Sequence, residues 1–254
     1  MVDCTGEISM VGAGMAGFCD GSRGIVHESP NLPGVKDLHL AEELSNGFGL
    51  PAFVENDATA AAWGEFLFGD NKGIRHMLAV TLGTGIGGGL VLDGRLYRGA
   101  RGFAGEIGHV PYDPQGPDCP CGGKGCLERF IGREPFEREY LLLAGLTDIV
   151  EPKIIHDRAR QGDKAAREAW DAYGHRLGVA LAGATNFFDL GAVILSGGIS
   201  GAWESFEIAM RSAFNMYLIT PLKGRVKITR SGLEGNAGLL GAAFLDRANE
   251  GQRN

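Results

Sequence analysis

The sequence lacks several features that would mark particular classes of protein. It has no run of 18 or more apolar residues and no basic stretch leading into an apolar one at its start. We therefore expect neither a membrane-spanning helix nor a secretory signal peptide. Lysine and arginine form no run and the net charge is −7, which disfavours binding to nucleic acid through charge. These absences predict a cytoplasmic chain that acts away from membranes and nucleic acid.

The residues that are present suit a sizeable globular chain. Its 254 residues are 44% hydrophobic and 22% charged, enough for one broad core or two lobes. The 42 glycines follow no collagen period and occur in clusters. Such clusters are typical of turns and of places where the backbone approaches a ligand.

Strand patterns alternate with helical patterns along the chain, which predicts an α/β fold. Asp93-Gly94 between two short apolar stretches indicates a hairpin. The strands are expected at 8–14, 51–55, 76–82, 90–92, 95–97, 192–195 and 226–229. The helices are expected at 37–47, 56–69, 165–188, 202–217 and 237–248.

Three of the five cysteines fall within the stretch CPCGGKGCLE, as Cys119, Cys121 and Cys126. Zinc takes four nitrogen or sulfur ligands, and His109 is the nearest histidine, so the spacing predicts a Cys3His zinc site. Free thiols in a glycine-rich loop are the alternative interpretation. A disulfide between Cys119 and Cys121 would be strained, and the C-x-x-C spacing of a redox pair is absent. The two other cysteines, Cys4 and Cys19, are expected to pack as small hydrophobic residues.

Two glycine turns follow predicted strands. Gly83-Thr84-Gly85 can direct backbone N–H groups and a hydroxyl toward phosphate, although the Gly-Lys-Ser/Thr of a P-loop is missing. Gly197-Gly198 lies between a strand and a helix, where a nucleotide could approach the carboxyl end of a sheet. A glycine-rich β-turn and an ordinary strand-to-helix turn are the structural alternatives.

Three carboxylates have positions that suit chemistry. Asp57 lies where a strand meets a helix and could accept a hydroxyl proton, although Asn56-Asp57 also suits a helix cap. Glu106 and Glu128 flank the proposed zinc ligands, so a bound metal would hold the two near each other, and carboxylates fixed in this way can accept hydrogen bonds from sugar hydroxyls. The alternative for these glutamates is a solvated surface.

Together these motifs resemble the ROK family of sugar kinases and repressors, and among its members the bacterial glucokinases are the most similar. The resemblance runs in order along almost the whole chain. The most specific part is E-x-G-H followed by C-x-C-G-x-x-G-C-x-E. The matching stretches are SPNLPG (29–34), VENDATAAAWGE (54–65), TLGTGIGGGLVLDGRLYRG (81–99), GFAGEIGH (102–109), CPCGGKGCLE (119–128), LSGGIS (195–200) and GNAGLLGAA (235–243).

The resemblance implies an actin-like, hexokinase-type ATPase fold, which is ribonuclease H-like, with two lobes around a cleft and usually a homodimer. It implies phosphorylation of a hexose by ATP with Mg²⁺, foremost glucose to glucose 6-phosphate, with Asp57 as the general base. Zinc would be structural. The implied sugar contacts are Asn56, Glu106, His109 and Glu128, and the implied nucleotide contacts are Gly83, Thr84, Gly85, Gly197 and Gly198.

The sequence departs from the family at its start, because the D-x-G-G-T motif that cradles phosphate is absent. We expect residues 1–58 to be the remainder of a small first lobe, shortened at its N-terminus and open at a sheet edge. Residues 59–254 would form the larger lobe, with the zinc loop at 103–128 and a last helix that can pack back on the first lobe. We expect weak or no kinase activity from a chain with this start.

Other functions remain open from the sequence. One alternative is the sugar-sensing domain of a ROK-type repressor, and another is a kinase for an N-acetylhexosamine or a different hexose. A zinc-stabilised binding module is a third, but it leaves Asp57 and the glycine turns unexplained.

Overall fold

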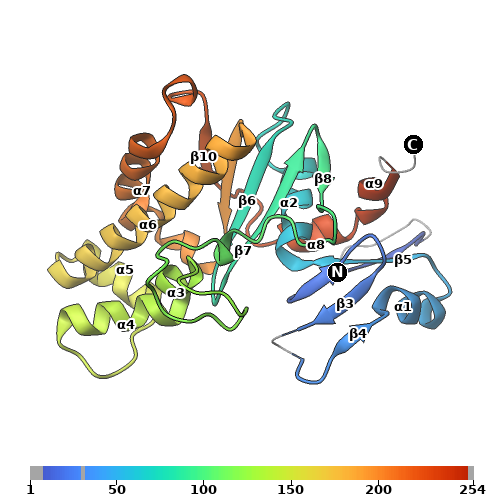
Figure 1. Cartoon of the computed structure of the whole chain (residues 1–254), viewed down its shortest axis with the longest axis horizontal. Coiled ribbons are helices and arrows are strands. Elements are labelled where there is room, and N and C mark those ends of the chain that lie inside the picture. The colour runs from blue at the N-terminus through green and yellow to red at the C-terminus, as the bar shows by residue number, and fades with distance from the viewer. Residues whose placement is uncertain (1–7, 30–31, 251–254) are drawn as a thin grey trace.

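The computed structural model describes residues 8–29 and 32–250, which form a mixed α/β structure (Figure 1). The expected α/β class is confirmed. Cys4 and part of the SPNLPG motif lie outside the described residues. Strands β1 to β5 and helix α1 lie at one end of the molecule, helices α3 to α7 lie at the other, and a central sheet separates them.

The central sheet has five strands in the order β10-β9-β6-β7-β8. Strand β6 is parallel to β9 and antiparallel to β7. Strands β7 and β8 are also antiparallel, and the predicted hairpin around Asp93-Gly94 joins them. The strands are β6 (Met77–Leu82), β7 (Ile86–Leu92), β8 (Arg95–Tyr97), β9 (Ala192–Ser196) and β10 (Lys227–Arg230).

The alternating side chains of β6 divide the core into two layers. Leu78 and Val80 face the larger cluster, which includes Leu177 of α6 and Phe206 of α7. Met77 and Ala79 face the smaller cluster, which includes Trp63 of α2. Successive strand residues point to opposite faces, so both faces of this sheet are apolar. Helices therefore cover the sheet on both sides.

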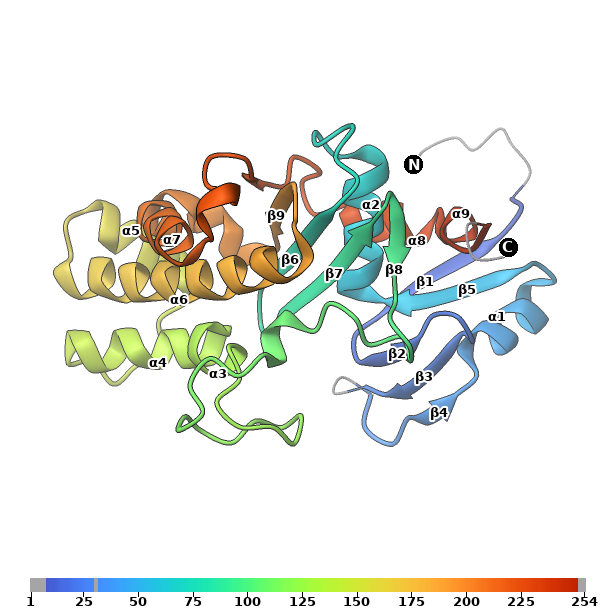
Figure 2. The same ribbon diagram turned by 45° about the horizontal axis from the view of Figure 1, so that its top comes forward.

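The helices divide between these faces (Figures 1 and 2). The larger cluster is covered by α3 (Glu128–Ile131), α4 (Arg133–Ala144), α5 (Pro152–Arg160), α6 (Lys164–Phe188) and α7 (Trp203–Tyr217). The opposite side carries α2 (Asp57–Phe68), α8 (Ala237–Ala242) and α9 (Leu245–Glu250). Short 3₁₀ helices form at Ile107–His109, Gly198–Ala202 and Thr220–Leu222.

Two small sheets form the end of the molecule that lies opposite helices α3 to α7. Strands β1 and β5 pair in parallel, and β2, β3 and β4 form an antiparallel sheet. Helices α8 and α9 lie beside β1 and β5, far from them in sequence (Figure 2). The elements are β1 (Val11–Met15), β2 (Phe18–Asp20), β3 (Ile25–Glu28), β4 (Lys36–Leu38), α1 (Leu40–Phe48) and β5 (Ala52–Asn56).

Two local predictions were wrong. The helix expected from Asp37 begins at Leu40, because Asp37 belongs to β4 and has a positive φ of 47°. The strand expected over 90–92 begins earlier, at Ile86, so Gly87 to Gly89 are strand residues of β7. A Cβ on Gly89 would lie 2.6 Å from the Cβ of Ala62, so this glycine lets α2 pack closely on the strand.

The buried Glu65 on α2 gives a pH-dependent prediction. Burial raises the pKa of its carboxyl, although a hydrogen bond donated by Ser231 opposes this. Between the ordinary and raised pKa values the folded chain keeps a proton that the unfolded chain loses, so stability falls as pH rises through that window. We expect Glu65→Gln to raise Tm by a few degrees at pH 8 and to lose this advantage near pH 4. Thermal unfolding across pH checks this, with the exposed Glu43→Gln as control.

Candidate active site

The histidine and three cysteines predicted to bind zinc come together. The Nδ1 of His109 and the Sγ atoms of Cys119, Cys121 and Cys126 all lie within 4.8 Å of one another. The Sγ atoms of Cys121 and Cys126 are 3.7 Å apart, which is close to the edge of about 3.8 Å in a tetrahedron with Zn–S bonds of about 2.3 Å. A disulfide would require about 2.05 Å, so these thiols are unbonded.

The chemistry of this cluster also suits a cation. Burial, followed by the neighbouring thiols of Cys121 and Cys119, raises the pKa of Cys126 to about 12. A zinc ion would reverse this by binding the thiolates directly. The four donors therefore fit zinc in number, type and spacing.

The ring of His109 joins this cluster to a neighbouring cavity. Its Nδ1 faces the Sγ of Cys119 at 3.7 Å, while its Nε2 lies 4.0 Å from Glu106 Oε2. The ring nitrogen on the thiol side is thus Nδ1, and Nε2 remains directed toward the carboxylate. One side chain can therefore serve a metal and a polar ligand at once.

The cavity next to His109 has a volume of about 340 Å³ and brings together all four predicted sugar contacts. These are Asn56, Glu106, His109 and Glu128. The rest of the lining comes from the hairpin β2–β3 and from the zinc loop, and apart from the predicted zinc ligand Cys121 no sequence pattern marks it: Gly17, Phe18, Glu28, Pro120 and Cys121. Both ends of the molecule therefore contribute to this cavity.

Asn56 and Asp57 have different roles at the start of α2. Asn56 is the N-cap, because its Oδ1 accepts hydrogen bonds from the backbone N–H groups of Ala58 and Thr59. Its Nδ2 donates to the carbonyl of Gly17 at 3.0 Å. Asp57 is the first helical residue and is exposed, and it lies outside the cavity lining. The cap of α2 is therefore Asn56. The Oδ1 of Asp57 accepts a hydrogen bond from the N–H of Ala58 at 2.8 Å, so Oδ2 is the oxygen that it offers for chemistry.

Several carboxylates converge beside this cavity. Burial raises the pKa of Glu106, and the charges of Glu128 and Asp57 raise it further against the lowering effect of His109. Burial and then the carboxylates of Glu55, Asp57 and Glu106 raise the pKa of Cys19 to about 12. Cys19 is buried as expected, and its thiol is protonated at neutral pH. A neutral molecule with many hydroxyl donors suits such surroundings.

Glu128 connects the zinc loop to the first glycine turn. Its Oε2 accepts a hydrogen bond from the backbone N–H of Ile86 at 2.8 Å. A Cβ on Gly85 would lie 2.3 Å from the same oxygen, so a side chain at this position would displace the Glu128 carboxylate. Glu128 thus lines the cavity and anchors the turn with one carboxylate.

The two glycine turns lie side by side. They follow the parallel neighbours β6 and β9, and a Cβ on Gly197 would lie 2.4 Å from the carbonyl oxygen of Leu82. Beside Gly198 is a cavity of about 250 Å³, lined also by Lys153, His156 and Asp157, which the sequence did not single out. Thr84 is exposed at the tip of the other turn. Both turns thus lie at the carboxyl ends of neighbouring parallel strands, a position at which α/β sheets commonly bind ligands.

Comparisons with known proteins place these features in context. The sequence matches the ROK family over residues 1–249. The glucokinase of Thermotoga maritima is 39% identical, with 94% of this chain and 79% of that protein covered. The ROK family glucokinase of Streptomyces griseus, crystallised with glucose and AMPPNP, is 35% identical with a TM-score of 0.84, over 95% of this chain and 82% of that one. The xylose repressor of Bacillus subtilis is 33% identical, over 92% of this chain and 60% of that protein. Among the helices of residues 8–29 and 32–250, none has both the length and the apolar composition that a membrane span requires.

Proposed function

The chain belongs to the ROK family, and from that premise we propose that it transfers a phosphoryl group from ATP to a hexose, foremost to glucose. It has the actin-like ATPase fold, with two lobes around a cleft. The observation that carries the proposal is the meeting of Asn56, Glu106, His109 and Glu128 in one cavity beside an exposed Asp57.

The roles of the sugar-side residues follow from their chemistry. Glu106 and Glu128 accept hydrogen bonds from sugar hydroxyls, and His109 adds its Nε2. Asn56 contacts the sugar while it fixes the start of α2. Asp57 takes the proton from the attacking hydroxyl as the general base.

The phosphoryl donor approaches along the two glycine turns. Gly83, Thr84 and Gly85 lie against the phosphates of ATP, and Gly197 with Gly198 lies on the adenosine side, next to the cavity that Lys153 and His156 line. ATP enters with Mg²⁺, which offsets the negative charge of its phosphates.

Zinc has a structural role in this proposal. His109, Cys119, Cys121 and Cys126 hold the ion, which supplies no chemistry beyond fixing their loop. Free thiols and the use of ATP both suit the cytoplasm, where we place the protein.

A panel of sugars tests the proposed reaction. We expect ATP-dependent release of ADP with glucose, slow in a chain without the D-x-G-G-T motif. We expect turnover with N-acetylglucosamine, N-acetylmannosamine, mannose and fructose to be at least about tenfold lower in kcat/KM, since a site that pairs with specific hydroxyls rejects altered ones. A coupled ADP assay measures this. The repressor relatives favour a second candidate, a sugar sensor, and glucose or xylose binding without turnover would support it instead.

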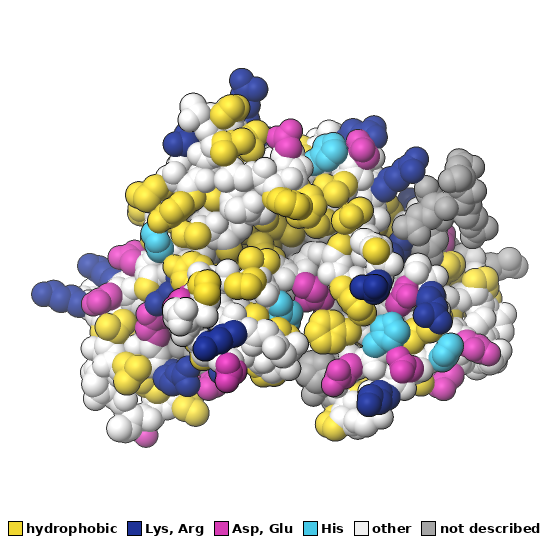
Figure 3. Space-filling view, in the orientation of Figure 1, with side chains coloured by type: hydrophobic (Ala, Val, Ile, Leu, Met, Phe, Trp, Pro, Cys, Tyr) yellow, Lys and Arg dark blue, Asp and Glu magenta, His cyan; other side chains and the backbone are white. Residues whose placement is uncertain are grey.

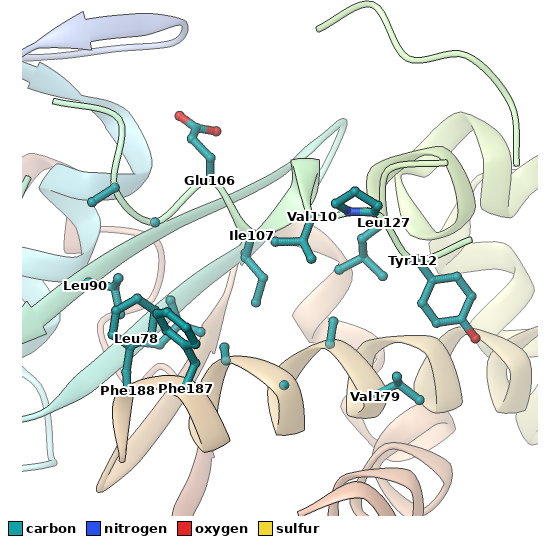
Figure 4. Close-up of a pocket in the computed structure, with 16 residues that line it drawn as sticks. Leu78, Leu90, Glu106, Ile107, Val110, Tyr112, Leu127, Val179, Phe187 and Phe188 are labelled. Carbon is teal, nitrogen blue, oxygen red and sulfur yellow. The ribbon is translucent and has the colours of Figure 1, made fainter. Parts of the chain in front are cut away.

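We also propose that the chain forms a homodimer through an apolar groove. The groove has a volume of about 530 Å³ and lies between α6, the central sheet and residues 104–112 (Figure 4). Phe187 is 82% exposed at its edge, and hydrophobic side chains form a band over α6 on that face (Figure 3). A two-fold axis beside the groove would bring one Phe187 into contact with its partner's groove.

The oligomeric state of Phe187→Glu tests this interface. A charge there would lose its solvation on association, so we expect the variant to be a monomer where the parent chain is a dimer. Light scattering after size exclusion gives the mass. Leu142→Glu, at a 78% exposed position on α4, is the control that should remain a dimer. A dimeric Phe187→Glu would mean that the interface lies elsewhere.

A further inference from the structure

A buried ion pair connects the two ends of the molecule close to the proposed active site. Arg98 Nε lies 2.6 Å from Glu55 Oε2, and their side chains are 4% and 0% exposed. Glu55 belongs to β5, and Arg98 follows β8 at the edge of the central sheet. Taking two charges out of water is unfavourable, and apolar residues often stabilise such a position equally well. The proposed function gives this pair no role so far.

Glu55 holds the backbone that carries the base. It directly precedes Asn56 and Asp57, and its Oε1 accepts a hydrogen bond from the backbone N–H of Asn56 at 3.1 Å. A Cβ on Gly21 would lie 2.2 Å from Glu55 Oε2, so the neighbouring chain closes tightly around the carboxylate. Any movement of Glu55 therefore displaces the start of α2.

Arg98 begins a segment that ends at Glu106, and we name residues 98–106 the strap. The backbone carbonyl of Arg98 accepts a hydrogen bond from the N–H of Ala104 at 3.1 Å, which folds the strap back on itself. Two residues beyond Ala104 lies Glu106, whose carboxylate points away from the apolar groove (Figure 4). The position of Arg98 thus determines the position of Glu106 at the other end of the strap.

The strap is also docked on the sheet β2–β3–β4. The ring of Phe103 meets Phe18 edge-on with centroids 5.7 Å apart, and it meets His27 at 5.9 Å. A Cβ on Gly102 would lie 2.7 Å from the carbonyl oxygen of Cys19, so only glycine allows this approach. The strap therefore spans the junction between the lobes, and Arg98 is its fixed end.

We propose that Arg98 is a positioning residue that fixes the position of Asp57 relative to Glu106. Its guanidinium holds Glu55 beside the base, and its carbonyl holds the strap that carries the sugar contact. The planar guanidinium, with its several fixed donors, suits a fixed geometry better than a lysine ammonium would. This inference rests on the proposed hexose kinase reaction, because it assigns Arg98 a task within that site.

Variants of the pair test the inference on the full chain with glucose and ATP. Arg98→Lys keeps the charge but changes the geometry, and we expect kcat to fall about 10- to 100-fold, as misplacement by about 1 Å does. The double variant Glu55→Gln with Arg98→Met removes both charges, so its Tm should be close to that of the parent while kcat stays low. Arg176→Lys is the matched control, because Arg176 forms a two-pronged ion pair with Glu139 away from the cleft, and its kcat should not change.

Amide hydrogen exchange gives a readout that does not depend on turnover. In Arg98→Lys we expect faster exchange in both 54–58 and 103–107, and little change across β6 or β9. Parent-like exchange in both segments, or a kcat that follows Tm across all variants, would overturn the inference. A parent chain without turnover would count against the proposed function, and the exchange data would then still decide whether Arg98 holds the two segments together.

Discussion

Asp57→Ala is expected to lower kcat for glucose phosphorylation by about 10³-fold or more, with glucose affinity within about threefold of the parent chain. The carboxylate of Asp57 is exposed beside the sugar cavity and does not line it, so its loss removes a proton acceptor and no wall of the site. A coupled ADP assay gives kcat, and titration calorimetry with glucose gives the affinity.

The control for Asp57→Ala must separate the base from the helix start. Asp163 is the N-cap of α6, where its Oδ1 accepts a hydrogen bond from the N–H of Ala166, far from the cleft. Asp163→Ala should lower stability by about 1 kcal/mol and leave kcat unchanged. If Asp57→Ala kept more than a tenth of the parent kcat, another group would have to accept the proton.

Cys126→Ser is expected to abolish zinc binding and to weaken glucose binding about 10- to 100-fold. Cys126 is buried, and its Sγ is one of the four candidate zinc ligands, so its replacement removes the metal that ties Cys126 to His109 and loosens the segments that carry His109 and Glu128. Elemental analysis should give about one zinc per parent chain and almost none in the variant. A chelator should reduce glucose affinity before the larger core unfolds.

The matched control for this prediction is Cys19→Ala. Cys19 is as buried as Cys126 but lies outside the cluster of thiols, so the variant should keep its zinc. Glucose affinity that stays constant through complete removal of zinc would contradict the proposed link between the metal and the sugar site.

Features set by nearby residues could be predicted from the sequence. The zinc ligands lie within 18 positions of one another, and the helix start at Asn56 follows from a local hydrogen-bond pattern. The long helix α6 and the buried strands β6 and β9 also follow from local patterns. These elements position the proposed base and the two glycine turns.

Features set by distant residues could not be predicted. The pairing of Glu55 with Arg98 joins positions 43 residues apart, and no periodicity marks either of them. Phe18 and Glu28 reach the sugar cavity through a hairpin whose short strands carry little pattern. The helix start at Asp37 was wrong because a three-residue strand precedes the helix, and an apolar period cannot show where one element gives way to the next.

The short segment around Glu106 and Ile107 acts as a partition between two compartments. Ile107 points into the apolar groove, while the Glu106 carboxylate points away from it and lines the sugar cavity (Figure 4). An occupant of the groove that shifts the backbone at Ile107 would also shift Glu106, since the two share a peptide bond. By thermodynamic linkage, such an occupant would change sugar affinity by the same factor as sugar changes its own. Occupation of the groove would thus change the affinity of the cavity for sugar.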